Sequence, residues 1–230
     1  MASAVYRCKI GLMNAARRAL GDRLVMEQYR RRSARKYRRA GIVFIHIPKA
    51  AGTSVCDSLY GGRVGHFTLS ELRHPPGRST APSGIEGLPS FSVVRDPLER
   101  LHSSYRYARD GGGTKGGINP DPAYRSTRFR SFGAFLEEWL VHQELTSLDR
   151  VFWPQSRFVD DAADGAVDFV GKVEDMGGVQ RWLRRNVSGD IAIPHLNRAR
   201  RASDAPSYRA EDRRIVRELY GEDYETFGYA

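Results

Sequence analysis

The sequence predicts an α/β fold of three layers, in which a central parallel sheet is flanked by helices. Two segments share the order buried strand, short loop and helix, and their strands lie at 42–46 and 91–94. A third short apolar segment, VDFVG at 167–171, also leads into a helical pattern. Strands that alternate with helices favour parallel pairing, because each helix returns the chain to the starting edge of the sheet and the next strand then runs in the same direction. A length of 230 residues with 40% hydrophobic content suits such a fold.

The first strand is the apolar run IVFIHI, which follows Gly41. A continuous apolar run of this length is typical of a strand buried on both faces. Pro48 and Gly52 then predict a turn, and TSVCDSLYG predicts a helix with Thr53 or Ser54 near its N-cap.

The second strand, FSVV at 91–94, ends at Arg95-Asp96-Pro97. Proline suits the first turn of a helix, where its missing N–H costs nothing, so LERLHSSYRYAR predicts a helix from Pro97 onward. The unit repeats the strand, loop and helix of the first.

The other elements follow from apolar periodicity and turn residues. We expect a short helix within GHFTLSELR, a loop at 110–122, and irregular structure at 194–206. Further helices are predicted at 9–20, 22–39, 131–142 and 207–219, and after the third strand, with Val179, Trp182 and Leu183 on its apolar side.

The net charge of +10 is confined to the N-terminal region. Residues 1–41 hold 12 Lys/Arg and 2 Asp/Glu, and the remaining residues hold equal numbers of each sign. We therefore divide the chain into a basic helical leader, 1–41, and a catalytic domain, 42–230, and we expect no nucleic-acid partner. The leader is interpreted as a loose basic arm, or else as a peripheral contact with an anionic membrane or polyanion.

The two cysteines, Cys8 and Cys56, predict neither a disulfide framework nor a cysteine metal site. No window approaches eighteen apolar residues, and the N-terminal region lacks the apolar stretch of a secretory signal. A cytoplasmic location, peripheral at a membrane if the leader binds one, is the resulting expectation.

The loop IPKAAGTS at 47–54 has the parts of an anion site. A loop between a buried strand and a helix directs backbone N–H groups from the positive end of the helix dipole. Gly52 permits close approach, Thr53 and Ser54 add hydroxyl donors, and Lys49 supplies a positive charge. A Walker A loop would carry its lysine directly before Ser/Thr, so this loop argues against an ordinary ATPase or GTPase.

The second motif should face the same strand ends, where open parallel sheets bind ligands. Arg95 ends the strand, and Arg100, Ser103 and Tyr105 follow on the helix. The alternative is that the two arginines pair locally with Asp96 and Glu99.

Together, HIPKAAGTS at 46–54 and SVVRDPLERLHSSY at 92–105 resemble the two nucleotide-binding motifs of the sulfotransferase superfamily. They are most similar to the carbohydrate branch that includes heparan sulfate 2-O-sulfotransferase and the chondroitin-type enzymes. Weaker similarity continues through PQSRFV at 154–159, DFVGKVEDM at 168–176 and PHLNRAR at 194–200.

The resemblance implies a P-loop-like fold and transfer of a sulfuryl group from 3′-phosphoadenosine 5′-phosphosulfate to a hydroxyl of a carbohydrate or other small acceptor. It assigns the 5′-phosphosulfate to Lys49, Ala51, Gly52, Thr53 and Ser54. It assigns the 3′-phosphate to Arg95 and Ser103. One departure is Ala51, because alanine disfavours the positive φ that such a cradle uses.

Catalysis would need a cation at the departing oxygen and a base for the acceptor hydroxyl. Lys49 suits the first role. His66, in VGHFTL between the two motifs, is our candidate base because the 2-O-sulfotransferase-like branch carries its catalytic histidine there; the alternative is a solvent-facing loop histidine. His46 within the first strand is expected to be packed, His102 to be structural, and His195 to lie near nucleotide or substrate. No metal cluster is visible, and the chemistry does not require one.

Two rival functions remain open. A kinase on the same architecture would need the lysine-Ser/Thr pair that the first loop lacks. A polyanion- or membrane-binding protein would act through the leader.

Overall fold

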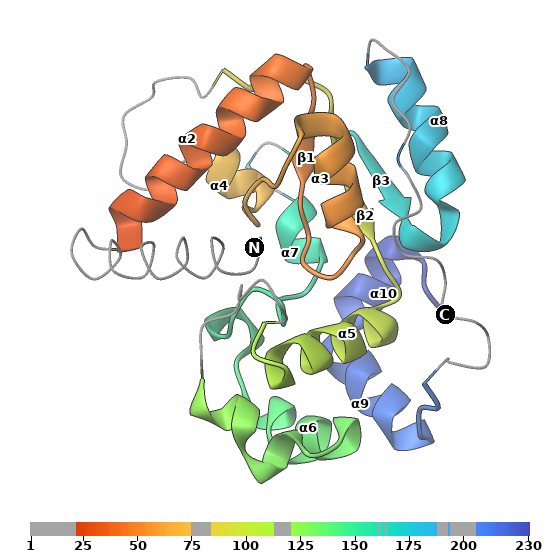
Figure 1. Cartoon of the computed structure of the whole chain (residues 1–230). Coiled ribbons are helices and arrows are strands. Elements are labelled where there is room, and N and C mark those ends of the chain that lie inside the picture. Colours follow the sequence, from red (N-terminus) through yellow and green to blue (C-terminus); the bar gives the residue numbers. More distant parts are fainter. Residues whose placement is uncertain are drawn as a thin grey trace.

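A parallel sheet of three strands lies at the centre of the fold (Figure 1). The computed structural model describes residues 22–74, 84–112, 121–160, 162–163, 165–187, 193 and 206–230. Its strands, β1 (Val43–Ile45), β2 (Ser90–Val94) and β3 (Phe169–Lys172), pair in parallel in the order β1-β2-β3. Every residue of β1 and β2 is buried, so both faces of the sheet are covered. The predicted parallel sheet flanked by helices is confirmed.

The helices alternate with the strands as expected. Those described are α2 (Asp22–Ala40), α3 (Gly52–Tyr60), α4 (Leu69–Arg73), α5 (Pro97–Arg109), α6 (Phe132–Glu138), α7 (Ser156–Val159), α8 (Met176–Asn186), α9 (Ala210–Leu219) and α10 (Gly221–Phe227). Pro97 is the first residue of α5, and Asp96 caps the helix by accepting a 2.9 Å hydrogen bond from the Glu99 N–H. The predicted start of this helix is therefore confirmed.

Helix α8 packs closely on one face of the sheet. Phe91 and Phe169 are paired in register, and the ring of Trp182 lies 5.4 and 5.0 Å from their centroids. A β carbon at Gly171 would lie 2.3 Å from a methyl group of Val179. Glycine in β3 thus allows the helix to approach the strand.

Helix α2, which belongs to the predicted basic leader, packs on the sheet through Tyr37. The Tyr37 side chain is fully buried, and its hydroxyl donates to the Phe44 carbonyl at 3.1 Å. The Ser33 hydroxyl accepts from the Gly65 N–H at 3.1 Å. Residues 22–40 are thus anchored to the sheet, and the interpretation of the leader as a loose arm is wrong for this part of it. Cys8 and the predicted helix 9–20 lie outside the described residues.

Two predicted helices have different boundaries in the structure. The single helix expected at 131–142 ends at Glu138, because Trp139 leaves helical geometry (φ −132°, ψ −58°) to bury its ring against Phe129 and Phe152. The last helix was expected at 207–219. It begins at Ala210, and α10 follows it, since Tyr220 turns the chain and donates from its hydroxyl to the Phe152 carbonyl at 2.6 Å.

A second apolar cluster lies beyond the sheet, among α5, α6, α9 and α10. Its fully buried members include Leu101, Phe135, Phe152, Val216 and Tyr220. Helix α5 begins three residues after the end of β2, the central strand, and contributes Leu101 to this cluster. It therefore connects the carboxyl end of the sheet to the second cluster. Within the described segments, no helix combines the length and the hydropathy needed to cross a bilayer.

Candidate functional site

The loop between β1 and α3 has an unusual backbone. Lys49 (φ 67°) and Ala51 (φ 56°) both lie in the left-handed region, although neither is glycine. Such residues cost about 1–3 kcal/mol each and persist only where the surroundings hold them. The expectation that Ala51 would resist positive φ is therefore wrong for this loop. Successive N–H groups around left-handed residues form anion-binding concavities.

The N-cap of α3 is Ala51, not Thr53 or Ser54 as the sequence suggested. Alanine has no side-chain acceptor, so the cap itself does not occupy the first N–H groups of the helix. Thr53 is exposed and Ser54 is buried. The loop thus presents a helix N-terminus suited to an external anion.

Gly52 is required by a neighbouring side chain. A β carbon at this position would lie 2.1 Å from Cδ2 and 2.3 Å from Nε2 of His46. Glycine is therefore needed here because the imidazole lies directly against the backbone, a reason that the sequence did not reveal.

Replacing Gly52 by alanine should lower the free energy of unfolding by about 1–3 kcal/mol, the usual cost of overpacking. Urea denaturation would measure the change. The matched control is Gly221→Ala, because Gly221 is likewise the first residue of a helix but has no atom within 4 Å of an added β carbon. Equal stability of the two variants would show that His46 moves aside without cost.

His46 is packed, as expected. Its ring stacks on Phe44 with 5.7 Å between centroids, and its Nδ1 lies 3.6 Å from Sγ of Cys56. Burial, together with the nearby His66, holds the pKa of His46 well below its usual range. The imidazole beneath the loop is therefore neutral.

His66 lies next to His46. Their ring centroids are 4.1 Å apart, and Nδ1 of His66 is 2.8 Å from the His46 carbonyl oxygen. A carbonyl can only accept, so Nδ1 carries the hydrogen and Nε2 is left to take up a proton. Since His46 contacts both Gly52 and the His66 ring, the structure brings His66 to the first loop.

The electrostatic surroundings of His66 keep it neutral. Burial, with Arg150 and Arg63, lowers the pKa of His66 from 6.5 to about 4. The residue as a whole is nevertheless exposed. Solvent therefore weakens the lowering of the pKa by burial. Repulsion by the two arginines still lowers the pKa.

An ion pair fixes the segment around His66. Nη1 of Arg150 donates to the His66 carbonyl at 2.6 Å and to Oε2 of Glu71 at 2.7 Å. Glu71 in turn forms a capping box with Thr68 at the start of α4. His66 is thus held at its main chain rather than left on a loose loop.

Lys49 lies in a cationic environment. Its ammonium is 4.3 Å from the centroid of the Tyr107 ring on α5. Burial, followed by the charges of Arg95, Arg106 and Arg63, lowers its pKa from the ordinary value. A bound anion would offset the repulsion among these positive charges.

Arg95 forms a local ion pair, as the alternative interpretation held. Its guanidinium donates to Glu99 at 3.1 Å, and the other oxygen of Glu99 accepts from the Tyr208 hydroxyl at 2.9 Å. The Arg95 side chain remains about one-third exposed. Ser103, eight residues along, is partly buried on α5. The phosphate contacts assigned to Arg95 and Ser103 stay predictions.

Arg100 does not form the local ion pair that the alternative interpretation predicted for it. It is fully buried, its Nε donates to the Pro48 carbonyl at 3.1 Å, and its Nη2 donates to the Val151 carbonyl at 3.3 Å. Burial lowers its pKa, and the charge of Asp223 acts against that shift. Arg100 therefore ties α5 to the first loop instead of pairing with Asp96 or Glu99.

Sequence reasoning missed the structural partners of the two motifs. Tyr107 beneath Lys49 and Gln155 beside Arg95 were not singled out. Gln155 belongs to the segment PQSRFV, and the similarity of this segment to sulfotransferases is the signal that points to it. The segment PHLNRAR at 194–200, which contains His195, lies outside the described residues.

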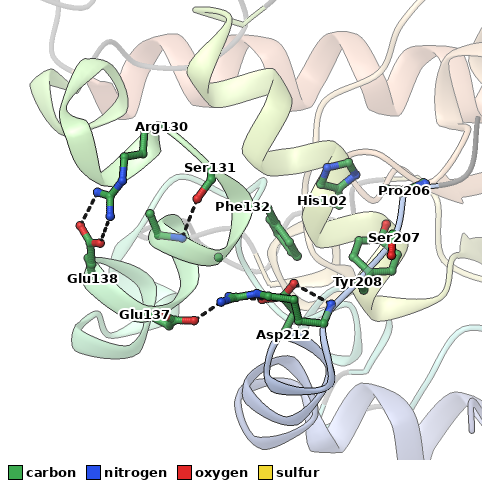
Figure 2. Close-up of a pocket in the computed structure, with 13 residues that line it drawn as sticks. His102, Arg130, Ser131, Phe132, Glu137, Glu138, Pro206, Ser207, Tyr208 and Asp212 are labelled. Atoms are coloured by element: carbon green, nitrogen blue, oxygen red, sulfur yellow. Dashed lines mark hydrogen bonds and ion pairs between the residues drawn. The ribbon is translucent and has the colours of Figure 1, made fainter.

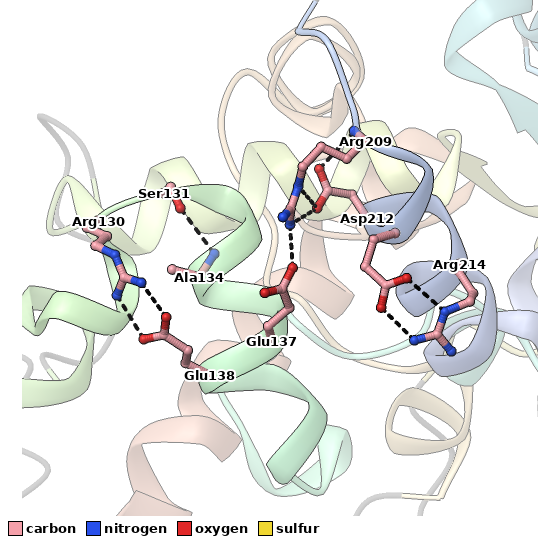
Figure 3. Close-up of polar contacts among 9 residues, drawn as sticks. Arg130, Ser131, Ala134, Glu137, Glu138, Arg209, Asp212 and Arg214 are labelled. Atoms are coloured by element: carbon pink, nitrogen blue, oxygen red, sulfur yellow. Dashed lines mark hydrogen bonds and ion pairs between the residues drawn. The ribbon is translucent and has the colours of Figure 1, made fainter.

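A cavity of about 460 Å³ lies among α6, the start of α9 and His102 (Figure 2). Its charged side chains pair with one another, Arg130 with Glu138 and Arg209 with Glu137 and Asp212 (Figure 3). The cavity is not lined by the predicted site residues. Tyr208 connects it to the ion pair of Arg95, because Tyr208 lines the cavity and donates to Glu99.

Across the described part of the chain, no three His, Cys, Asp or Glu side chains gather as a metal site would require. Cys56 is buried, and burial raises the pKa of its thiol to about 11.

Comparison with known proteins gives one match. The model of a family described as the sulfotransferase family matches residues 85–230. The matched region contains Arg95, Ser103 and Gln155, and it begins after the first loop and His66. No curated protein and no solved structure matches the chain.

Proposed function

The chain belongs to the sulfotransferase family, and we propose that it transfers a sulfuryl group from 3′-phosphoadenosine 5′-phosphosulfate to a hydroxyl of a carbohydrate-type acceptor. One observation carries the choice of donor. A loop with two left-handed residues, Lys49 and Ala51, is tied by Arg100 to the helix that follows Arg95. Cationic and N–H groups therefore follow the ends of two adjacent parallel strands, an arrangement that would suit a ligand with two separate phosphates.

The residues present fit such a donor. The His46 ring lies where a Gly52 β carbon would be, so glycine lets this imidazole support the loop backbone from one side. Lys49 and Arg95 repel each other across the site. A ligand with negative groups at both ends would offset that repulsion.

The donor supplies the sulfuryl group and a phosphate leaving group. Lys49 places a positive charge where negative charge develops on the departing oxygen. His66 accepts the proton of the acceptor hydroxyl at Nε2, since its Nδ1–H is committed to the His46 carbonyl. The backbone N–H groups of the loop and Arg95 hold the donor in line.

The acceptor class rests on the resemblance of the two motifs to the carbohydrate branch. A cytoplasmic location, with a peripheral membrane contact through residues 1–41, completes the proposal.

Calorimetric titration with 3′-phosphoadenosine 5′-phosphate tests the donor. We expect micromolar binding that exceeds binding of ATP with Mg²⁺. Arg95→Ala should weaken it by about 10–100-fold, since a hydrogen bond to a charged group contributes about 1.5–3 kcal/mol. Lys49→Ala should weaken it as well.

Arg109→Ala is the control, because Arg109 is the last residue of α5, is exposed and pairs with Asp110. It should bind like the unaltered protein. Preference for ATP with Mg²⁺ would contradict the proposal and favour a kinase.

A further inference from the structure

The main chain of Arg95 is held by a side chain from a distant part of the sequence. Oε1 of Gln155 accepts from the Arg95 N–H at 3.0 Å, and Nε2 of the same amide donates to the Arg95 carbonyl at 2.8 Å. Gln155 is fully buried. One amide thus satisfies both backbone groups of one residue.

This contact occurs where the sheet ends. The last residue of β2 is Val94, which pairs with Lys172, and α5 begins at Pro97. Arg95 therefore follows the last register pair of the strand and precedes the helix, where its buried main-chain groups still need hydrogen-bond partners. The Gln155 amide supplies a partner for both of them.

Gln155 is itself fixed by α10. The Gln155 N–H donates to Oδ2 of Asp223 and the Ser156 N–H donates to Oδ1, each at 2.8 Å. Asp223 is fully buried, and its charge acts on the buried Arg100. A buried polar network therefore runs from the C-terminal helix to the backbone of the second motif, with little freedom to relax.

We infer that Gln155 is a positioning residue for recognition of the 3′-phosphate, acting through the main chain of Arg95; this inference rests on the proposed function. The Arg95 guanidinium is only partly buried and is paired with Glu99, so it must exchange that carboxylate for a phosphate. A fixed backbone restricts where the exchanged side chain can point. Gln155 thereby favours nucleotides that carry a 3′-phosphate over those that lack one.

The chemistry of the amide makes the inference testable. A glutamine side chain offers a donor and an acceptor at the same reach. Gln155→Glu keeps an acceptor for the Arg95 N–H but cannot donate to the Arg95 carbonyl when ionised. Methionine in Gln155→Met has a similar volume, but it has no hydrogen-bond donor and only a weak acceptor.

The experiment compares two nucleotides by calorimetry: 3′-phosphoadenosine 5′-phosphate, and adenosine 5′-phosphate, which lacks the 3′-phosphate. Gln155→Met should weaken binding of the first by about 5–100-fold, in line with the cost of unpaired buried groups. Binding of the second should change by less than about twofold. Gln155→Glu should lie between Gln155→Met and the unaltered protein.

Two further variants complete the test. In an Arg95→Ala background, Gln155→Met should cause no additional loss of the preference, since two residues that act through one contact are not additive. Gln143→Met is the control, because the Gln143 amide also donates to a main-chain carbonyl, that of Trp139, away from the second motif. It should leave both affinities unchanged.

Each outcome separates the inference from the proposed function. If the unaltered protein does not prefer the 3′-phosphorylated nucleotide, the proposed function fails. If it does, and Arg95→Ala removes the preference while Gln155→Met keeps it, the inference alone is overturned. An equal loss for both nucleotides would show a merely structural role and would overturn it too. Should Gln155→Met not fold, Gln155→Glu decides by the same ratio.

Discussion

Replacing His66 by alanine is expected to lower turnover by about 10²–10⁴-fold, the usual contribution of a general base. Nucleotide affinity should hardly change, because the His66 ring packs against His46, which lies between it and Gly52 of the loop. The expected split, a large loss of kcat with an unchanged Kd for 3′-phosphoadenosine 5′-phosphate, distinguishes a base from a binding residue. Sulfuryl transfer to a sugar acceptor and calorimetry on the same samples would measure the two quantities.

The pH dependence gives a second readout of the same residue. A base works in its neutral form, and the pKa of His66 is lowered from 6.5 toward about 4. Turnover should therefore persist below pH 6.5 and fall only as the pH drops through the lowered pKa. Removing the repelling charge with Arg150→Gln should raise that pKa and move the loss of activity to higher pH.

His142→Ala is the control for His66→Ala, since His142 is exposed on a short turn after α6. It should retain full turnover. Near-normal turnover of His66→Ala, with nucleotide binding intact, would exclude His66 as the base and return the search to carboxylates.

Replacing Arg100 by methionine is expected to lower the free energy of unfolding by about 3–5 kcal/mol, the cost of breaking a buried charged contact on one side. Methionine retains much of the side-chain volume, so loss of packing is not the main cause. The substitution leaves the carbonyls of Pro48 and Val151 without this donor and removes the positive charge near Asp223. Chemical denaturation would measure the loss.

Nucleotide binding should weaken in the same variant at temperatures where it remains folded, because the Pro48 carbonyl precedes the left-handed Lys49. Arg109→Met is the matched control, since Arg109 lies on the same helix, is exposed and pairs with Asp110. If Arg100→Met were as stable as Arg109→Met, the buried guanidinium would not hold the loop.

The sequence by itself determined the sheet and the two motifs. Short buried apolar runs, interrupted by Pro48 and Gly52 or by Pro97, predict strands, turns and helix starts through local geometry alone. The parallel order of β1 and β2 then follows from alternation with helices. Loop chemistry at 47–54 and 95–103 followed from the same local patterns, which is why the candidate residues of both motifs could be named.

Only the tertiary structure decided how those motifs are held. Arg100 reaches a carbonyl 52 residues away, and Gln155 reaches the Arg95 backbone across 60 residues and is fixed by Asp223 across 68. Such contacts leave no period or spacing in the sequence, because each partner could equally satisfy its hydrogen bonds with neighbours or water. The left-handed conformation of Ala51 is a further example. The local preference of alanine opposes that conformation, so the residue type alone did not predict it.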